Sequence, residues 1–277
     1  MEITVQTFLL LTATAFACEF VDSAMGMGYG TILAPLLLLL GFPPHAAVPA
    51  VLISQAFGGL TASIFHHQFE NVSFAKDSRD LKVVFVISGL GVMATVVGAF
   101  VSINLPATAL KVYIGVLVTI MGVLVLRSVP TTFSWKKIVG LGILSAFNKG
   151  ISGGGFGPVV TGGQIIAGEN RRAAVGITTL SEAPICICAF LAYLVGRTAN
   201  EVQGRVLDMP VADFFRTMFA PGMFPWELIL ALIIGSMLVA PFGAFTTRAL
   251  KRQGAHYVIG GLMLMEGLYT VVALLLK

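Results

Sequence analysis

The chain alternates between long apolar segments and short polar connections. A helix needs about 20 apolar residues to cross a hydrocarbon core, and six uninterrupted segments meet that length: 46–65, 83–104, 110–128, 173–196, 226–247 and 256–276. Two more apolar segments, 5–41 and 137–168, are interrupted by glycines. This pattern predicts an all-α integral membrane protein that crosses the bilayer several times.

The two halves of the sequence repeat each other. Residues 20–62 align with residues 147–189 without a gap at an offset of 127, and 11 of the 43 pairs are identical. Further along, residues 98–100 match residues 243–245 at an offset of 145, so the second half carries 18 additional residues within about 197–225. We therefore expect a first membrane repeat at 1–130 and a second at 131–277. Each repeat would hold one glycine-broken segment and three full transmembrane helices.

The orientation of the pseudo-symmetric repeats depends on the broken segments. If each crosses the membrane once, the repeats are parallel; if each returns as a re-entrant hairpin, they are inverted. Basic pairs flank the second broken segment on both sides, at 136–137 and 171–172, and a hairpin places both pairs in the cytoplasm, where cationic loops belong. The first broken segment is flanked by Glu2 and by Pro43-Pro44-His45, with no Lys or Arg. We predict inverted repeats with both termini outside.

The breaks themselves are glycine clusters inside apolar segments. Unwound backbone at membrane depth is tolerated where protein buries it or where it lines a wet cavity. The pieces 137–148 and 155–168 would each rise about 20 Å as helix, which predicts a break near the midplane. A helix that restarts there offers free amides and a positive dipole end to an anion. The alternative is that the glycines allow close helix packing. The break residues predicted to bind substrate are Gly26, Met27, Gly28, Gly153, Gly154 and Gly155.

Ionisable residues stand beside the breaks at matched positions. Asp22 and Lys149 are equivalent in the repeat, and Gln55 and Glu182 are the next matched pair. An ionisable side chain at this depth is costly and indicates function. Lys149 would be the counter-ion of an anionic substrate or the partner of Asp22. Asp22, Glu182 and Glu19 are the proton-coupling candidates, because a carboxylate removed from water can be protonated in one state of a cycle. Structural hydrogen bonding is the alternative for each acid.

Several neutral side chains could donate hydrogen bonds to a bound anion or, alternatively, join helices. They are Asn148, Ser152, Gln164, Thr178 and Thr179, and with Gln55 and Lys149 they complete the predicted substrate site. Glu266 in the last segment is a further intramembrane acid.

Composition agrees with a membrane protein: 57% of residues are hydrophobic and 11% are charged, against roughly 25% charged in soluble domains. The net charge of +4 lies in short loops, where it sets orientation and indicates no nucleic-acid partner. The three cysteines form no metal-binding pattern, so we expect neither a metal nor a cofactor. The expected partners are the lipid bilayer and a small anionic substrate, in a multi-pass protein of the inner (plasma) membrane; a homo-oligomer is left open.

At the breaks the chain resembles the TauE/SafE family of membrane permeases, described as exporters of sulfite and organosulfonates. The resemblance extends over nearly the whole chain and rests on residues 20–30 (FVDSAMGMGYG), residues 31–35 (TILAP) and residues 148–158 (NKGISGGGFGP). It implies export of a small sulfur-containing anion, coupled to protons. A related group of thiosulfate transporters uses central cysteines, and neither break contains one.

Other classes of function leave weaker traces. Residues 150–153 read Gly-Ile-Ser-Gly, as in rhomboid intramembrane proteases, but the four histidines lie near segment ends, away from the candidate base position. An anion channel stays open, because unwound backbone also builds selectivity filters. The connection at 198–225 is either a solvated, charge-balanced loop or a lid over the outer mouth.

Overall fold

The computed structural model describes residues 3–127, 135–166, 169–203, 209–220 and 222–249, together with scattered positions between 257 and 272. Glu266 and most of the expected last segment, 256–276, lie outside the described residues. Within the described part there are helices and no strands. The helices are α1 (Val5–Met25), α2 (Tyr29–Leu39), α3 (Pro44–Gln68), α4 (Arg79–Asn104), α5 (Ala107–Arg127), α6 (Trp135–Ser152), α7 (Phe156–Ile166), α8 (Arg171–Glu201), α9 (Val211–Met218) and α10 (Trp226–Ala249).

The starts of the long helices follow from local sequence. The Thr4 and Ser78 hydroxyls cap α1 and α4 by accepting from backbone amides three residues on, and the Asn170 side chain caps α8 through the amide of Arg172. Pro44 opens α3 at a position where its missing N–H costs nothing. These caps explain why α3, α4 and α8 begin slightly before the expected apolar segments.

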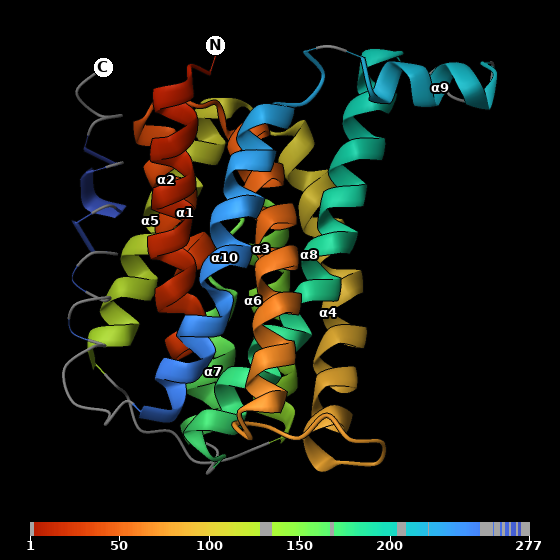
Figure 1. The fold of residues 1–277 in the computed structure, drawn as a ribbon. Coiled ribbons are helices and arrows are strands. Elements are labelled where there is room, and N and C mark those ends of the chain that lie inside the picture. Colours follow the sequence, from red (N-terminus) through yellow and green to blue (C-terminus); the bar gives the residue numbers. More distant parts are fainter. Residues whose placement is uncertain are drawn as a thin grey trace.

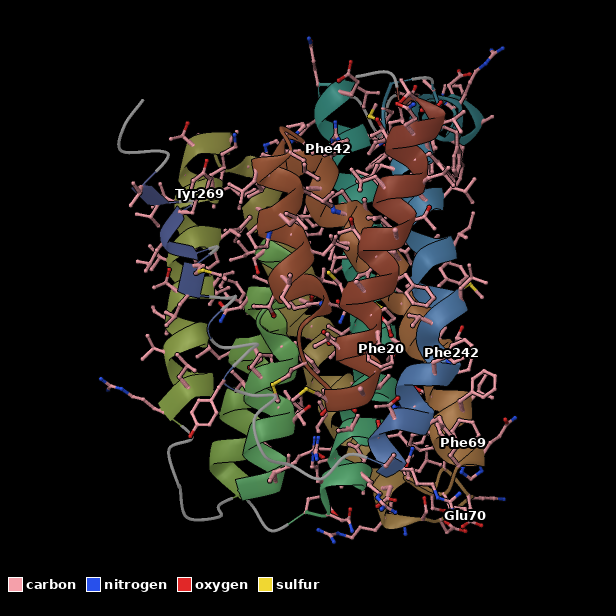
Figure 2. The ribbon with its side chains drawn as sticks, turned by 60° about the vertical axis from the view of Figure 1, so that its left-hand side comes forward. Phe20, Phe42, Phe69, Glu70, Phe242 and Tyr269 are labelled. Carbon is pink, nitrogen blue, oxygen red and sulfur yellow. The ribbon has the colours of Figure 1, made fainter. Side chains whose placement is uncertain are left out.

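Five helices in the described part are long and apolar enough to cross a membrane: α1, α3, α4, α8 and α10. The most buried of them are α3 and α8, which pack against each other; α10 and α4 pack on their flanks, α1 packs on α10, and α6 packs on α4. The outer surface is apolar, with exposed side chains such as Phe85, Met93 and Phe242, and Phe242 points away from the bundle in Figure 2. An apolar exterior around a core that holds charged side chains is the reverse of a soluble bundle.

The two broken segments fold back inside the bundle. The N-terminal end of α1 and Phe42, just after α2, lie at one end of the molecule, whereas Phe69 and Glu70, just after α3, lie at the other (Figures 1 and 2). Phe20 lies between these levels (Figure 2), so α1 ends within the bundle and α2 returns toward the N-terminal end. The other short arm, α7, lies toward the opposite end (Figure 1). Both breaks therefore meet inside the protein.

Candidate functional site

The first break is a tight turn that α1 and α2 share. Gly26 follows α1 with φ of 72°, a left-handed conformation that favours glycine, and its N–H donates to the carbonyl oxygen of Asp22 at 2.6 Å. Three residues later α2 begins at Tyr29, whose N–H donates to Oδ1 of Asp22 at 3.1 Å. The carboxylate of α1 therefore caps the N-terminus of α2, and this positive helix end already faces an anion from the protein.

The second break has the same backbone but the opposite charge. Gly153 follows α6 with φ of 76°, its N–H donates to the carbonyl oxygen of Lys149 at 2.9 Å, and α7 begins at Phe156. Each of these positions lies 127 residues after its counterpart in the first break. Because a lysine has no acceptor to offer, Lys149 leaves the N-terminus of α7 without the carboxylate cap that Asp22 gives to α2.

The two breaks pack against each other through their backbones. The N–H of Gly155 donates to the hydroxyl of Thr31 at 3.1 Å, and the hydroxyl of Thr161 donates to the carbonyl oxygen of Gly26 at 2.7 Å. A Cβ on Gly30 would collide with the carbonyl oxygen of Gly153. The glycines were interpreted either as unwound backbone or as sites of close helix packing, and both features are present at this crossing.

Four side chains from both repeats form one polar chain at the crossing, which we call the central network. Nζ of Lys149 lies 2.8 Å from Oε1 of Glu182 and donates a second hydrogen bond to Oε1 of Gln55. The amide nitrogen of Gln55 donates to Oδ2 of Asp22 at 3.4 Å. All four residues are at most 3% exposed. They are the two matched pairs of the repeat, and Asp22 meets Lys149 through Gln55 rather than directly.

A third carboxyl group lies beside the central network. Glu19, fully buried one turn before Asp22, accepts a hydrogen bond from the Ser23 hydroxyl at 2.6 Å through Oε1. Its Oε2 has no hydrogen-bond partner in the described part of the chain. One buried ammonium thus faces three buried carboxyl groups. Because an unpaired buried charge is costly, one ammonium does not compensate three ionised carboxylates.

Two predicted neutral donors lie on α7 and α8, next to the second break. The amide nitrogen of Gln164 donates to the hydroxyl oxygen of Thr178 at 2.9 Å, and Thr161 lies at the same distance from that oxygen. Oε1 of Gln164 is buried without a partner among the described residues. Thr179 bonds only within α8 in the contacts observed, donating to the carbonyl oxygen of Val175. Gln164 and Thr178 therefore remain part of the crossing, whereas Thr179 belongs to its own helix.

The remaining predicted residues line the same crossing. Oδ1 of Asn148 accepts a hydrogen bond from the Tyr113 hydroxyl of α5. The Ser152 hydroxyl donates to the carbonyl oxygen of Asn148 at 2.8 Å and accepts from the N–H of Gly154 at 3.1 Å, which stabilises the second break. Met27 is partly buried against the apolar core. Within the part of the chain that is described, no three His, Cys, Asp or Glu side chains are grouped to hold a metal ion.

Sequence reasoning missed a second polar cluster that holds the end of α1. His66 accepts at Nδ1 from the amide of Asn71, and its Nε2 therefore donates to the carbonyl oxygen of Ser23 at 2.9 Å. The Thr247 hydroxyl donates to the same carbonyl at 3.0 Å. These donors satisfy the last carbonyl groups of α1, which have no partner in the helix. The position of His66 at the end of an apolar segment was the available signal.

A bundle of apolar helices that buries charged side chains between two helix breaks defines a multi-pass membrane transporter. The chain belongs to the Sulfite exporter TauE/SafE family, whose model matches residues 11–270. The resemblance seen at the breaks is thereby confirmed.

Individual relatives carry similarly general names. The chain is 23% identical over 268 residues to the probable membrane transporter protein YtnM of Bacillus subtilis (strain 168), covering 92% of this chain and 79% of YtnM. It is 21% identical over 301 residues to the probable membrane transporter protein YunE of the same organism, covering 95% of this chain and all of YunE. No solved structure gives a significant match.

Proposed function

We propose that this transporter exports a small sulfur-containing anion, sulfite or an organosulfonate, across the inner (plasma) membrane. The observation that carries the proposal is the placement of Lys149, which is 1% exposed and lies on α6 one turn before the second break, where α7 has no carboxylate cap from its own break. A small oxyanion bound there would meet both the ammonium and the amides of α7. The name of the family supports sulfite as the anion.

The proposed architecture is a pair of inverted repeats. Its support is the matched ends of the helices: α1 and α6 end at positions 127 apart, and so do α2 and α7. The short arm α2 returns toward the N-terminal end, and α7 lies toward the other end (Figure 1). In such folds the substrate site lies where the two repeats meet. The central network joins side chains from both repeats, which supports it as the proposed site.

The proposed binding step is an exchange of partners on Lys149. Glu182 holds the ammonium in the described conformation, and a substrate anion competes with it for the same cation. Once displaced, Glu182 would be a buried carboxylate without a counter-charge, which is costly. It therefore takes up a proton as the anion binds. A monovalent anion and a proton together leave the net charge of the site unchanged.

This exchange sets the sign of the coupling. Because anion and proton bind together, protons move in the same direction as the anion. Glu19 and Asp22 are further proton sites in the same buried volume. Asp22 accepts from two donors, the N–H of Tyr29 and the amide of Gln55, which suits an ionised carboxylate, whereas Oε2 of Glu19 is the open position.

Two other classes make different predictions. A channel would give ion currents that do not saturate, whereas alternating access gives saturable flux. A rhomboid-like protease needs a base on its serine, and the observed partners of the Ser152 hydroxyl are backbone atoms of the break. The proposal accordingly treats Ser152 as a helix-break residue.

The direct test is anion flux into liposomes that contain the purified protein. We expect saturable uptake of sulfite or methanesulfonate by the wild type and a loss of at least tenfold in Lys149→Ala. The matched control is Lys82→Ala, which removes an exposed lysine at the end of a span. Unchanged flux in Lys149→Ala would overturn the role of Lys149. No flux of either anion in the wild type would overturn the substrate class.

A further inference from the structure

The inserted connection of the second repeat contains a short helix, α9, that crosses the direction of the spans. It leaves the end of α8, lies level with the helix ends and projects sideways from the bundle (Figure 1). α9 lies within residues 198–225, the connection expected to be a solvated loop or a lid.

The surface of α9 is divided lengthwise. Val211, Phe215 and Phe219 recur every four residues, so they form one stripe, and they are 71%, 52% and 58% exposed. Phe214 and Met218 face inward: Met218 is buried, and both pack on the apolar core. Of the remaining positions, Asp213, Arg216 and Thr217 carry polar side chains, and Ala212 is small. The helix thus has one buried edge, one exposed apolar edge and one polar edge.

The spans determine what surrounds the exposed stripe. Exposed apolar side chains of α8, such as Leu191 and Val195, must face lipid in a membrane protein, and α9 starts beyond the same end of that helix. The ring of Phe219 stacks on the ring of Trp226 with centroids 5.7 Å apart. Trp226 opens α10, and tryptophan at the end of a span is typical of the membrane interface. The stripe is therefore continuous with a lipid-facing surface.

We propose that α9 lies in the membrane interface, with Val211, Phe215 and Phe219 inserted at the boundary between headgroups and acyl chains. Amphipathic helices bind there with the axis parallel to the bilayer. A second copy of the chain is the other candidate occupant. Three side chains about half exposed offer on the order of 300 Å², well below the roughly 800 Å² per partner of a stable interface. Asp213 and Arg216 balance each other, so the anchor needs no anionic lipid.

The anchor is tested by the depth of single tryptophans in liposomes. In the full-length protein, Trp135→Phe and Trp226→Phe remove the native tryptophans, and Phe215→Trp is compared with Asp213→Trp on the opposite face of α9. We expect brominated lipids to quench Phe215→Trp at least threefold more than Asp213→Trp, equally in neutral and in anionic liposomes.

Two other patterns of quenching would overturn the proposal. Equal, weak quenching by brominated lipids with strong quenching of both positions by aqueous iodide would place α9 in water. Blue-shifted emission of Phe215→Trp that resists both quenchers would place the stripe against protein, as in a dimer. Sulfite flux is not a readout here, so the anchor and the transport function can fail independently.

Discussion

Gln55 lies between Lys149 and Asp22 and binds both. Its carbonyl oxygen accepts from the ammonium of Lys149, and its amide nitrogen donates to the carboxylate of Asp22. Because an amide has one accepting and one donating end, the two charges fix its orientation. Asp22 in turn caps α2 through Tyr29. A change of hydrogen-bond partner at Lys149 in the second repeat can thus alter, through Gln55 and Asp22, the cap at the N-terminus of α2 in the first repeat.

Asp22→Asn tests this chain of hydrogen bonds. The asparagine has one carbonyl oxygen in place of two carboxylate oxygens, so it can cap Tyr29 only by turning its NH₂ group toward the amide nitrogen of Gln55. The NH₂ groups of the asparagine and of Gln55 would then face each other. To accept from the asparagine, Gln55 would have to rotate its amide, which turns its own NH₂ group toward the ammonium of Lys149. We expect anion flux to fall about tenfold or more, from a loss on the order of 1–3 kcal/mol for each unsatisfied buried group. Flux is measured in liposomes, and wild-type flux in Asp22→Asn would contradict the linked orientation.

The ion pair between Lys149 and Glu182 predicts a specific pattern of stability. Lys149→Met leaves Glu182 buried without its cation, which costs about 3–5 kcal/mol, whereas replacing both charged residues by apolar residues of similar volume can be nearly neutral. We therefore expect Lys149→Met to lower the melting temperature in detergent strongly, and the double variant Lys149→Met/Glu182→Leu to recover most of that loss. Thermal unfolding of all three proteins measures this. Additive losses in the double variant would show that the pair does not couple in the folded state.

Much of the fold could be predicted, because it depends on patterns that one sequence displays. The gap-free repeat predicted matching breaks, and the matched pairs of helix ends lie 127 residues apart, such as Met25 and Ser152 or Tyr29 and Phe156. The α-helical membrane class follows from apolar length alone. α9 was not predicted, since eight residues with mixed polarity give too weak a periodic signal.

For the candidate site, the sequence indicated residues but not their contacts. The matched polar positions of the repeat identified Asp22, Lys149, Gln55 and Glu182, but not which of them would pair. Partner choice depends on how α3 and α8 pack beside the crossing, and sequence spacing does not contain that information. The hydrogen bond from Thr161 to Gly26 was missed for the same reason, because it joins positions that the repeat does not relate.

The close crossing of the breaks predicts that Gly30 tolerates no side chain. A methyl group there would collide with the carbonyl oxygen of Gly153, and backbone at a packed crossing cannot move away cheaply. Overpacking of this kind costs about 1–3 kcal/mol or more, so we expect Gly30→Ala to lower both the melting temperature and the flux. Gly89→Ala is the matched control, because a methyl group there meets nothing within 4 Å and alanine favours helix. Equal melting temperatures for the two variants would argue against the tight crossing.

The exchange of partners on Lys149 predicts how Glu182→Gln behaves. Glutamine keeps an oxygen that can accept from Lys149, so the fold and the cation stay in place, but the side chain can no longer take up a proton. In wild-type liposomes loaded with a pH-sensitive dye, we expect sulfonate uptake to acidify the interior. In Glu182→Gln, we expect uptake to continue with a weaker dependence on external pH and with little or no acidification.

Glu19→Gln serves as the comparison, because Glu19 does not contact Lys149 in the described contacts and its loss should leave the competition for the ammonium intact. If Glu182→Gln acidified the liposomes as the wild type does, the proton would travel on another group, and Glu19 with its open oxygen would be the next to test.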